Sequence, residues 1–318
     1  MNGFTENSEN KIKVLNMRYV LLILFWLVTG FGVSSQIRVT EFSTGLLLTE
    51  DGDSVLFYQV QPKSLNGKYE RCNYIHPLWA PDGTVLTEDF PADHLHHRGI
   101  FWAWHQIFAD GKNLGDGWEL KNFSQKVDHF KIRKAKCGSL KLITTVEWKS
   151  TEYVSGEKPF LLENTEITIH PAEMNYRRID FRISLKALAK GLEIGGSDDE
   201  KGYSGFSVRM KLPDDVTFTG PEGIVKPENT AVQSPGFINV SGSVLKNNGK
   251  GGVVILDNPQ NPEYPQRWIL RAKNSMQNAA FPGRNRILLN MKQPLILKYS
   301  IIVYEGEISE IAKTEVVK

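Results

Sequence analysis

Hydrophobic and polar residues alternate with a period of two along most of the chain. In residues 178–185 (RIDFRISL), four apolar side chains alternate with charged or hydroxyl side chains. The same alternation occurs in residues 141–148, 163–169, 206–212 and 295–304. Successive side chains of a strand point to opposite faces of a sheet. This pattern therefore predicts half-buried strands of antiparallel sheets.

Short turn signals separate these predicted strands. They are residues 51–52 (DG), 82–83 (DG), 110–111 (DG), 213–215 (PDD) and 247–252 (NNGKGG). Many short strands joined by turns are typical of an all-β sandwich or barrel. No repeat, linker or composition shift marks a boundary, so we expect one large antiparallel β-sandwich domain over residues 36–318. Its best candidate for a helix is short, at residues 307–313.

The N-terminal segment has the composition of a secretory signal peptide. Arg18 precedes the apolar run 19–33, and small residues follow before Gln36. We expect residues 1–35 to be removed, with Met17 as an alternative start, and the mature protein to be exported to the periplasm or secreted. An uncleaved anchor is the alternative, although the 15-residue run is shorter than the roughly 20 residues that a membrane span needs.

Composition and charge narrow the classes of protein. Hydrophobic residues make up 41% of the chain, and 38 Lys and Arg are dispersed against 36 Asp and Glu. Dispersed basic residues argue against a nucleic-acid partner. Cys72 and Cys137 lie in no metal-binding pattern, and a disulfide or two free thiols remain equally open.

Four of the seven histidines lie in the stretch DHLHHRGIFWAWHQI, residues 93–107. We expect a loop that enters a strand at residues 99–107. If residues 94–97 are extended, His94 and His96 point to one side and His97 to the other. In the strand, Trp102 and Trp104 would share one face, and His105 would lie on the other.

Three interpretations of this stretch remain open. The histidines could transfer protons near neutral pH, with Arg98 binding an anion and Trp102 and Trp104 stacking on a sugar. His94, His96 and His105 could instead hold a divalent metal ion. In the third interpretation the histidines only cap loop backbone groups and the tryptophans belong to the core.

Two further segments are candidates for a site. Residues 195–209 (GGSDDEKGYSGFSVR) lead from a glycine-rich, acidic loop into a strand and supply Glu200, Lys201 and Tyr203. Residues 257–268 contain three prolines and end in Arg267 and Trp268, which could line a binding site.

Together these segments resemble the PmoA-like family, also catalogued as a domain of unknown function. The stretch 93–107 with Trp118 resembles its DHxHHRG core, and residues 200–210, 252–271 and 294–306 resemble three further family segments. Leu95 replaces a usual proline, and Asn258 and Ile269 replace frequent histidines.

The resemblance implies a sandwich similar to that of galactose-mutarotase-like sugar enzymes. It also implies an exported protein of carbohydrate-degrading bacteria. We expect no cofactor, with a divalent metal ion held by histidines as the alternative. It does not imply methane oxidation, because the mature chain has no apolar span of the required length.

The resemblance and the residues together predict a dehydratase, a hydro-lyase that acts on oligosaccharides of an algal-type polysaccharide such as ulvan. It would eliminate water from the uronic acid at the non-reducing end. Arg98 would neutralise the carboxylate, His96 or His97 would remove the C5 proton, and His105 or Tyr203 would protonate the C4 oxygen. Glu200 and Arg267 would help to bind substrate.

The alternatives belong to other classes of protein. A polysaccharide lyase would use the same chemistry on a bond to another sugar. A glycoside hydrolase would need two carboxylates, with Glu119, Glu163 and Glu200 as candidates. A non-catalytic sugar-binding module would use the tryptophans alone, and a metal-binding protein or metal-dependent oxygenase would use the histidines as ligands.

Overall fold

The computed structural model describes residues 36–274 and 276–308. Contacts along the chain separate residues 1–35 from a second unit, Gln36–Lys318, which contains every element given below. The predicted signal segment lies outside the described residues, as does most of the helix predicted at residues 307–313.

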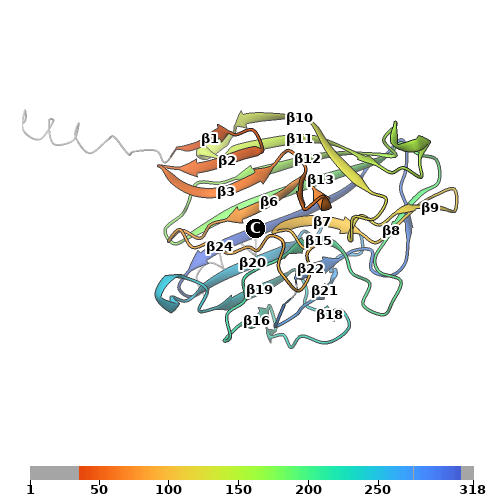
Figure 1. Cartoon of the computed structure of the whole chain (residues 1–318). Helices are drawn as coiled ribbons and strands as arrows, with labels where there is room; N and C mark the ends of the chain where they lie inside the picture. Colours follow the sequence, from red (N-terminus) through yellow and green to blue (C-terminus); the bar gives the residue numbers. More distant parts are fainter. Residues whose placement is uncertain (1–35, 275, 309–318) are drawn as a thin grey trace, which may run out of the picture. The chain divides into compact units, whose positions relative to one another are not determined.

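Two nine-stranded antiparallel sheets form the fold (Figure 1). In spatial order, the first sheet contains β1 (Ile37–Glu41), β2 (Gly45–Glu50), β3 (Asp53–Gln59), β6 (Tyr74–Leu78), β7 (Ile100–Trp104), β15 (Ser204–Val208), β22 (Gln277–Ala280), β21 (Arg267–Ile269) and β18 (Val232–Gln233). The second contains β10 (Ser124–Lys134), β11 (Leu140–Lys149), β12 (Leu161–Ile169), β13 (Tyr176–Ala187), β24 (Leu295–Glu305), β20 (Gly251–Asp257), β19 (Phe237–Gly242), β16 (Thr217–Gly220) and β17 (Gly223–Ile224).

Smaller elements complete the described residues. A four-stranded sheet contains β23 (Ile287–Leu288), β14 (Leu192–Gly195), β8 (Gln106–Ala109) and β9 (Lys112–Gly115), and β4 (Lys63–Leu65) pairs with β5 (Lys68–Arg71). Three single 3-10 turns are η1 (Lys136–Gly138), η2 (Val154–Gly156) and η3 (Lys246–Asn248). The predicted all-β antiparallel sandwich is confirmed, whereas its likeness to galactose-mutarotase-like enzymes stays a prediction.

The alternating pattern explains the core between the two large sheets. On β13, Ile179, Phe181, Ile183 and Leu185 are at most 2% exposed and join one apolar cluster with residues of the other sheet. Burying each such side chain contributes about 1.5–3 kcal/mol, so the alternation selects which face turns inward.

Two predicted strands are shorter than the pattern suggested. The strand expected at 206–212 ends at Val208, after which residues 209–211 pair with residues 86–88 and no longer with β7. The strand expected at 99–107 is broken at His105, where β7 of the first large sheet gives way to β8 of the four-stranded sheet. This break places His105 at a junction between two sheets.

A second apolar cluster covers the outer face of the first sheet at β7. It consists of Tyr74, Phe101, Ala103, Trp118 and Met276, with Tyr203 packed against it. Because both faces of β7 are covered, all five of its residues are buried. The candidate site lies over this outer cluster.

Both cysteines are free thiols in the structure, Cys72 buried and Cys137 exposed. Within the described residues, none of the helical segments has the length and apolar character that crossing a membrane requires.

Candidate functional site

The histidine segment is a pair of turns and not the extended stretch that we expected. The amide of His94 donates to the Pro91 carbonyl at 3.0 Å, and the amide of His97 donates to the His94 carbonyl at 2.9 Å. Gly99 then starts β7 with φ +46°, and a Cβ there would lie 2.0 Å from the Ile75 carbonyl oxygen. Only glycine fits this entry to the strand.

The turns bring three imidazoles together. His94 and His97 stack with ring centroids 4.5 Å apart, and His96 meets His97 edge-on at 4.6 Å. In an extended segment the ring of His97 would have pointed away from the other two. The segment therefore presents its histidines as one cluster.

His97 is the buried centre of this cluster, at 3% exposure. Arg209 lies 3.3 Å from its Nδ1 and donates two hydrogen bonds to Asp93, each within 2.9 Å. Burial, followed by the nearby charges of His96, His94 and Arg209, lowers the pKa of His97 to about 2. His97 is therefore neutral at physiological pH and contributes to packing.

His96 is half-buried and lies at the edge of the cluster, with the Tyr69 ring 6.5 Å away. Burial lowers the pKa of His96 to about 4, although the charge of Glu119 opposes this change. A histidine with this pKa is unprotonated at neutral pH and can accept a proton.

His105 is oriented by a carboxylate. Its Nδ1 lies 2.8 Å from Oδ2 of Asp116, whose Oδ1 accepts from the backbone amides of Trp118 and Glu119. A carboxylate at Nδ1 fixes the ring tautomer and stabilises the protonated imidazole.

Trp118 connects the separate parts of the site. Its ring lies 6.3 Å from His97, 5.3 Å from His105 in a stacked arrangement, and 5.7 Å from Tyr203. β7 and β15 pair antiparallel with Ser204 opposite Trp104. The next residues along these strands, Tyr203 and His105, therefore lie beside each other at one end of the ladder.

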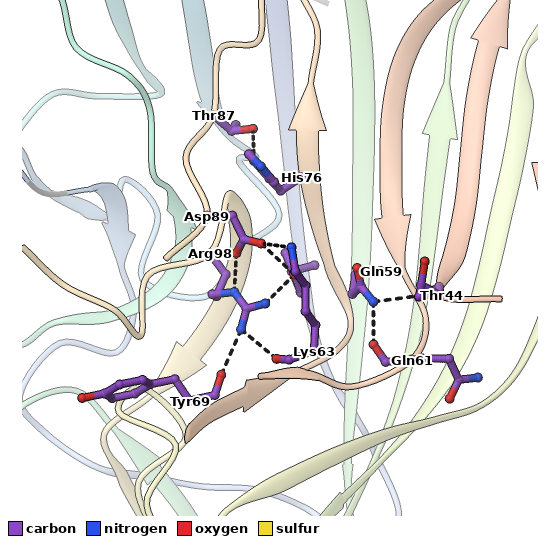
Figure 2. Close-up of polar contacts among 10 residues, drawn as sticks. Thr44, Gln59, Gln61, Lys63, Tyr69, His76, Thr87, Asp89 and Arg98 are labelled. Atoms are coloured by element: carbon purple, nitrogen blue, oxygen red, sulfur yellow. Dashed lines mark hydrogen bonds and ion pairs between the residues drawn. The ribbon is translucent and has the colours of Figure 1, made fainter. Parts of the chain in front are cut away.

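Arg98 does not occupy the position predicted for it. Its side chain is 0% exposed, and its guanidinium binds Asp89 and the carbonyls of Lys63 and Tyr69 (Figure 2). It also binds the Tyr74 hydroxyl. Because these partners surround the guanidinium, it cannot bind a substrate carboxylate. The prediction that Arg98 neutralises that carboxylate is wrong for this structure.

Arg98 instead ties the β4–β5 hairpin to the histidine segment. The two carbonyls it binds, of Lys63 and Tyr69, belong to that hairpin, and the same hairpin places Tyr69 beside His96. Burial raises the pKa of Asp89, but the charge of Arg98 and its hydrogen bond lower it, and the pKa lies below its usual value. The ion pair therefore stays charged. Arg98 is a positioning residue.

Trp102 and Trp104 are core residues, so the prediction that they stack on a sugar is also wrong. They are 2% and 0% exposed. Trp102 stacks on Phe206, and Trp104 packs on Trp148 and donates to the Phe281 carbonyl. The inward face of a strand in a two-layer sandwich is closed to ligands.

Glu200 and Arg267 lie apart from the histidines. Both are exposed and line a cavity of about 420 Å³ with Lys201, Glu263 and Arg284. The structure thus divides the predicted residues into a histidine group joined by Trp118 and this second cavity.

The three carboxylates considered for hydrolysis lie in three different environments. Glu119 is half-exposed and pairs with Lys121, and Glu200 belongs to an exposed loop. Glu163 is 0% exposed, binds Asn73, Trp148 and Thr165, and has a pKa raised by burial.

Among residues 36–274 and 276–308, no three His, Cys, Asp or Glu side chains are arranged to hold a metal ion. The metal alternative with His94, His96 and His105 stays a prediction.

Sequence reasoning missed the residues that orient the site, which are Asp116, Arg209, Tyr69 and Asp89. Arg209 is the last residue of the segment 195–209, and Asp89 precedes the histidine stretch 93–107, but nothing in the spacing of either residue predicts its partner. Only Asp116 could have been suspected from the sequence. It directly follows β9, the strand that the DG turn pairs with β8, and β8 begins next to His105.

Residues 46–317 match the family of unknown function DUF6807. The chain belongs to this family. No curated protein matches it. Membership in DUF6807 supplies no activity, and the resemblance to the PmoA-like family stays a prediction.

Proposed function

We propose that this DUF6807 protein is a carbohydrate-active dehydratase that eliminates water from a uronic acid at the non-reducing end of an oligosaccharide. One observation carries the proposal. A half-buried imidazole with a lowered pKa, His96, packs on His97, and a carboxylate-bound imidazole, His105, packs on Trp118, whose ring also contacts His97.

In this reaction His96 accepts the C5 proton of the uronic acid. The C4–O bond breaks, the C4=C5 double bond forms, and the leaving hydroxyl takes a proton to depart as water. His105, supported by Asp116, supplies that proton, with Tyr203 as the neighbouring alternative. An unprotonated imidazole as the base and a second imidazole held by a carboxylate as the acid suit such a pair of proton transfers.

The substrate carboxylate needs a cation in place of Arg98, and Arg271 is the best candidate. Its guanidinium lies 5.4 Å from the Tyr203 ring. The hydrogen bonds described for it go to main-chain carbonyls of Glu228, Asn229 and Leu270, and not to carboxylates. Its positive charge is therefore available to stabilise the developing enolate.

The structure favours this acid–base pair over the glycoside hydrolase alternative. Two carboxyl groups must face one glycosidic bond in such enzymes. Glu163 is sealed between the sheets, and Glu200 lines the separate cavity.

The test is incubation of the purified protein with oligosaccharides that end in a saturated uronic acid. We expect new ultraviolet absorbance from a C4=C5 double bond, with loss of one water and no chain shortening. Absorbance with chain cleavage would identify a polysaccharide lyase instead. No change on a broad panel would reject elimination, and metal analysis and sugar-binding assays would then test the remaining alternatives.

A further inference from the structure

A groove on the second large sheet combines volume with a local excess of positive charge. Its cavity of about 670 Å³ is lined by residues of β10, η1, β11, β12, β13 and β24, together with Asn258. This volume lies within the roughly 300–1,000 Å³ of small-molecule sites. None of the histidine-site residues lines it.

Seven basic side chains and two carboxylates line this groove. The basic residues are Arg133, Lys134, Lys136, Lys141, Arg178, Arg182 and Lys298, and the carboxylates are Glu166 and Asp180. The whole chain is almost neutral, with 38 Lys and Arg against 36 Asp and Glu. The charge of the groove is thus a local feature.

Both carboxylates are already engaged by other groups. Glu166 accepts from Lys141 at 2.6 Å. Asp180 is bound by Arg178 at 2.7 Å, by His170 at 2.7 Å and by Ser300 at 2.6 Å. No ion pair joins Arg182 to a carboxylate in the described part of the chain, and Arg182 is exposed.

Arg182 lies directly opposite Lys298 in the pairing of β13 with β24. On its other side it lies opposite Glu166 of β12, whose carboxylate already binds Lys141. Both side chains line the groove. Like charges opposite each other on a sheet face destabilise the strand pair. An oxyanion between them would replace this repulsion by attraction, and arginine offers it a planar fork of donors.

We propose that this groove is a second binding site for the sulfate or carboxylate groups of an acidic oligosaccharide. The oxyanion chemistry follows from the charges, and the choice of an oligosaccharide as carrier rests on the proposed function. The half-buried hydroxyl of Thr168 lines the same groove and can bond a sugar hydroxyl. A concave site favours a short chain over a membrane surface.

The test compares Arg182→Gln with Lys186→Gln. Lys186 is also exposed on β13, four residues further along and outside the groove, so it controls for loss of one charge. Binding of a sulfated or uronate tetrasaccharide is measured by calorimetry, with a neutral tetrasaccharide and inorganic sulfate as further probes. We expect Arg182→Gln to weaken the acidic ligand by about tenfold, and Lys186→Gln to have little effect.

Elimination activity is measured on the same samples. If the protein is active but Arg182→Gln does not weaken binding, the binding site in the groove is rejected and the dehydratase proposal stands. If Arg182→Gln weakens binding but the protein has no elimination activity, the binding site is supported and the dehydratase proposal is rejected. Equal affinity for the neutral tetrasaccharide, equal loss in both variants, or binding only to vesicles of anionic phospholipid would each overturn the proposal.

Discussion

Nδ1 of His105 lies 2.8 Å from the Asp116 carboxylate, which two backbone amides hold in place through its other oxygen. The amides fix the carboxylate, and the carboxylate fixes the ring. This leaves Nε2 as the ring nitrogen that does not face Asp116. The ring of His105 is thus held in one orientation, as the proposed proton transfer requires.

Replacing Asp116 with Asn tests this arrangement. Asn keeps an oxygen for the two amides but removes the negative charge beside Nδ1 of His105. We expect kcat for elimination to fall by about tenfold to a hundredfold, with a smaller change in KM. Steady-state kinetics across pH measure both.

Asp128→Asn is the matched control, because Asp128 also contacts a histidine, His129 at 3.1 Å, on the exposed strand β10. That variant should keep the wild-type kinetics. Equal losses in the two variants would contradict a specific function of Asp116.

His96 should determine the acidic limit of the reaction. Because its pKa is about 4, the ring stays neutral at pH values well below 6.5, the ordinary pKa of histidine. We expect the rate to stay level from pH 7 to about 5 and to fall as the ring becomes protonated. His96→Gln should lower kcat by about a hundredfold or more. A rate that instead fell near pH 6.5 would assign the base to another group.

Arg98→Lys distinguishes a positioning residue from a substrate contact. Lysine has three donors on one nitrogen and cannot bind all four groups that the guanidinium binds, so the β4–β5 hairpin should lose protection in hydrogen exchange. We expect the KM of a uronate substrate to rise. In a binding assay, the Kd of its carboxyl-reduced analogue should rise by a similar factor. A loss confined to the uronate would return Arg98 to the carboxylate.

Trp102 and Tyr69 should behave in opposite ways. Trp102→Ala opens a cavity between the sheets and should lower the free energy of unfolding by about 3–5 kcal/mol. Sugar affinity of the folded fraction should not change.

Tyr69→Ala removes a half-buried ring beside His96 and should weaken sugar binding at nearly constant stability. Chemical denaturation and calorimetry on both variants decide between these outcomes.

The sequence predicted the fold well because strand alternation is a local signal. Ile179 and Phe181 could be assigned to the core from their neighbours alone. The same rule misled us at Trp102 and Trp104. Alternation places two residues on one face, but it does not say whether another sheet covers that face.

The sequence indicated which residues belong to the site, but not how their side chains are arranged. His97 and His105 do contact Trp118, and His94 and His96 pack on His97. The guanidinium of Arg98 is occupied by Asp89 and by a hairpin more than 25 residues away in the sequence. No local sequence pattern reveals these contacts. Burial and long-range partners decided which charged residue remained available.

Protonation of His97 should couple stability to pH. Burial, and then neighbouring charges, lower its pKa to about 2, whereas in the unfolded chain it should titrate near 6.5. Below pH 6.5 the unfolded chain therefore binds a proton that the folded chain excludes. The contribution of neutral His97 is complete above pH 6.5 and decreases as the pH falls, by about 1.4 kcal/mol per pH unit at most.

His97→Gln cannot titrate at this position, so the stability difference between wild type and variant should narrow as the pH falls from 7 to 4. Glu163 and Asp257, whose pKa values are raised by burial, titrate in both proteins and cancel in the difference. Urea denaturation at each pH measures it. A difference that does not change with pH would mean that His97 takes up its proton in the folded protein as easily as in the unfolded chain.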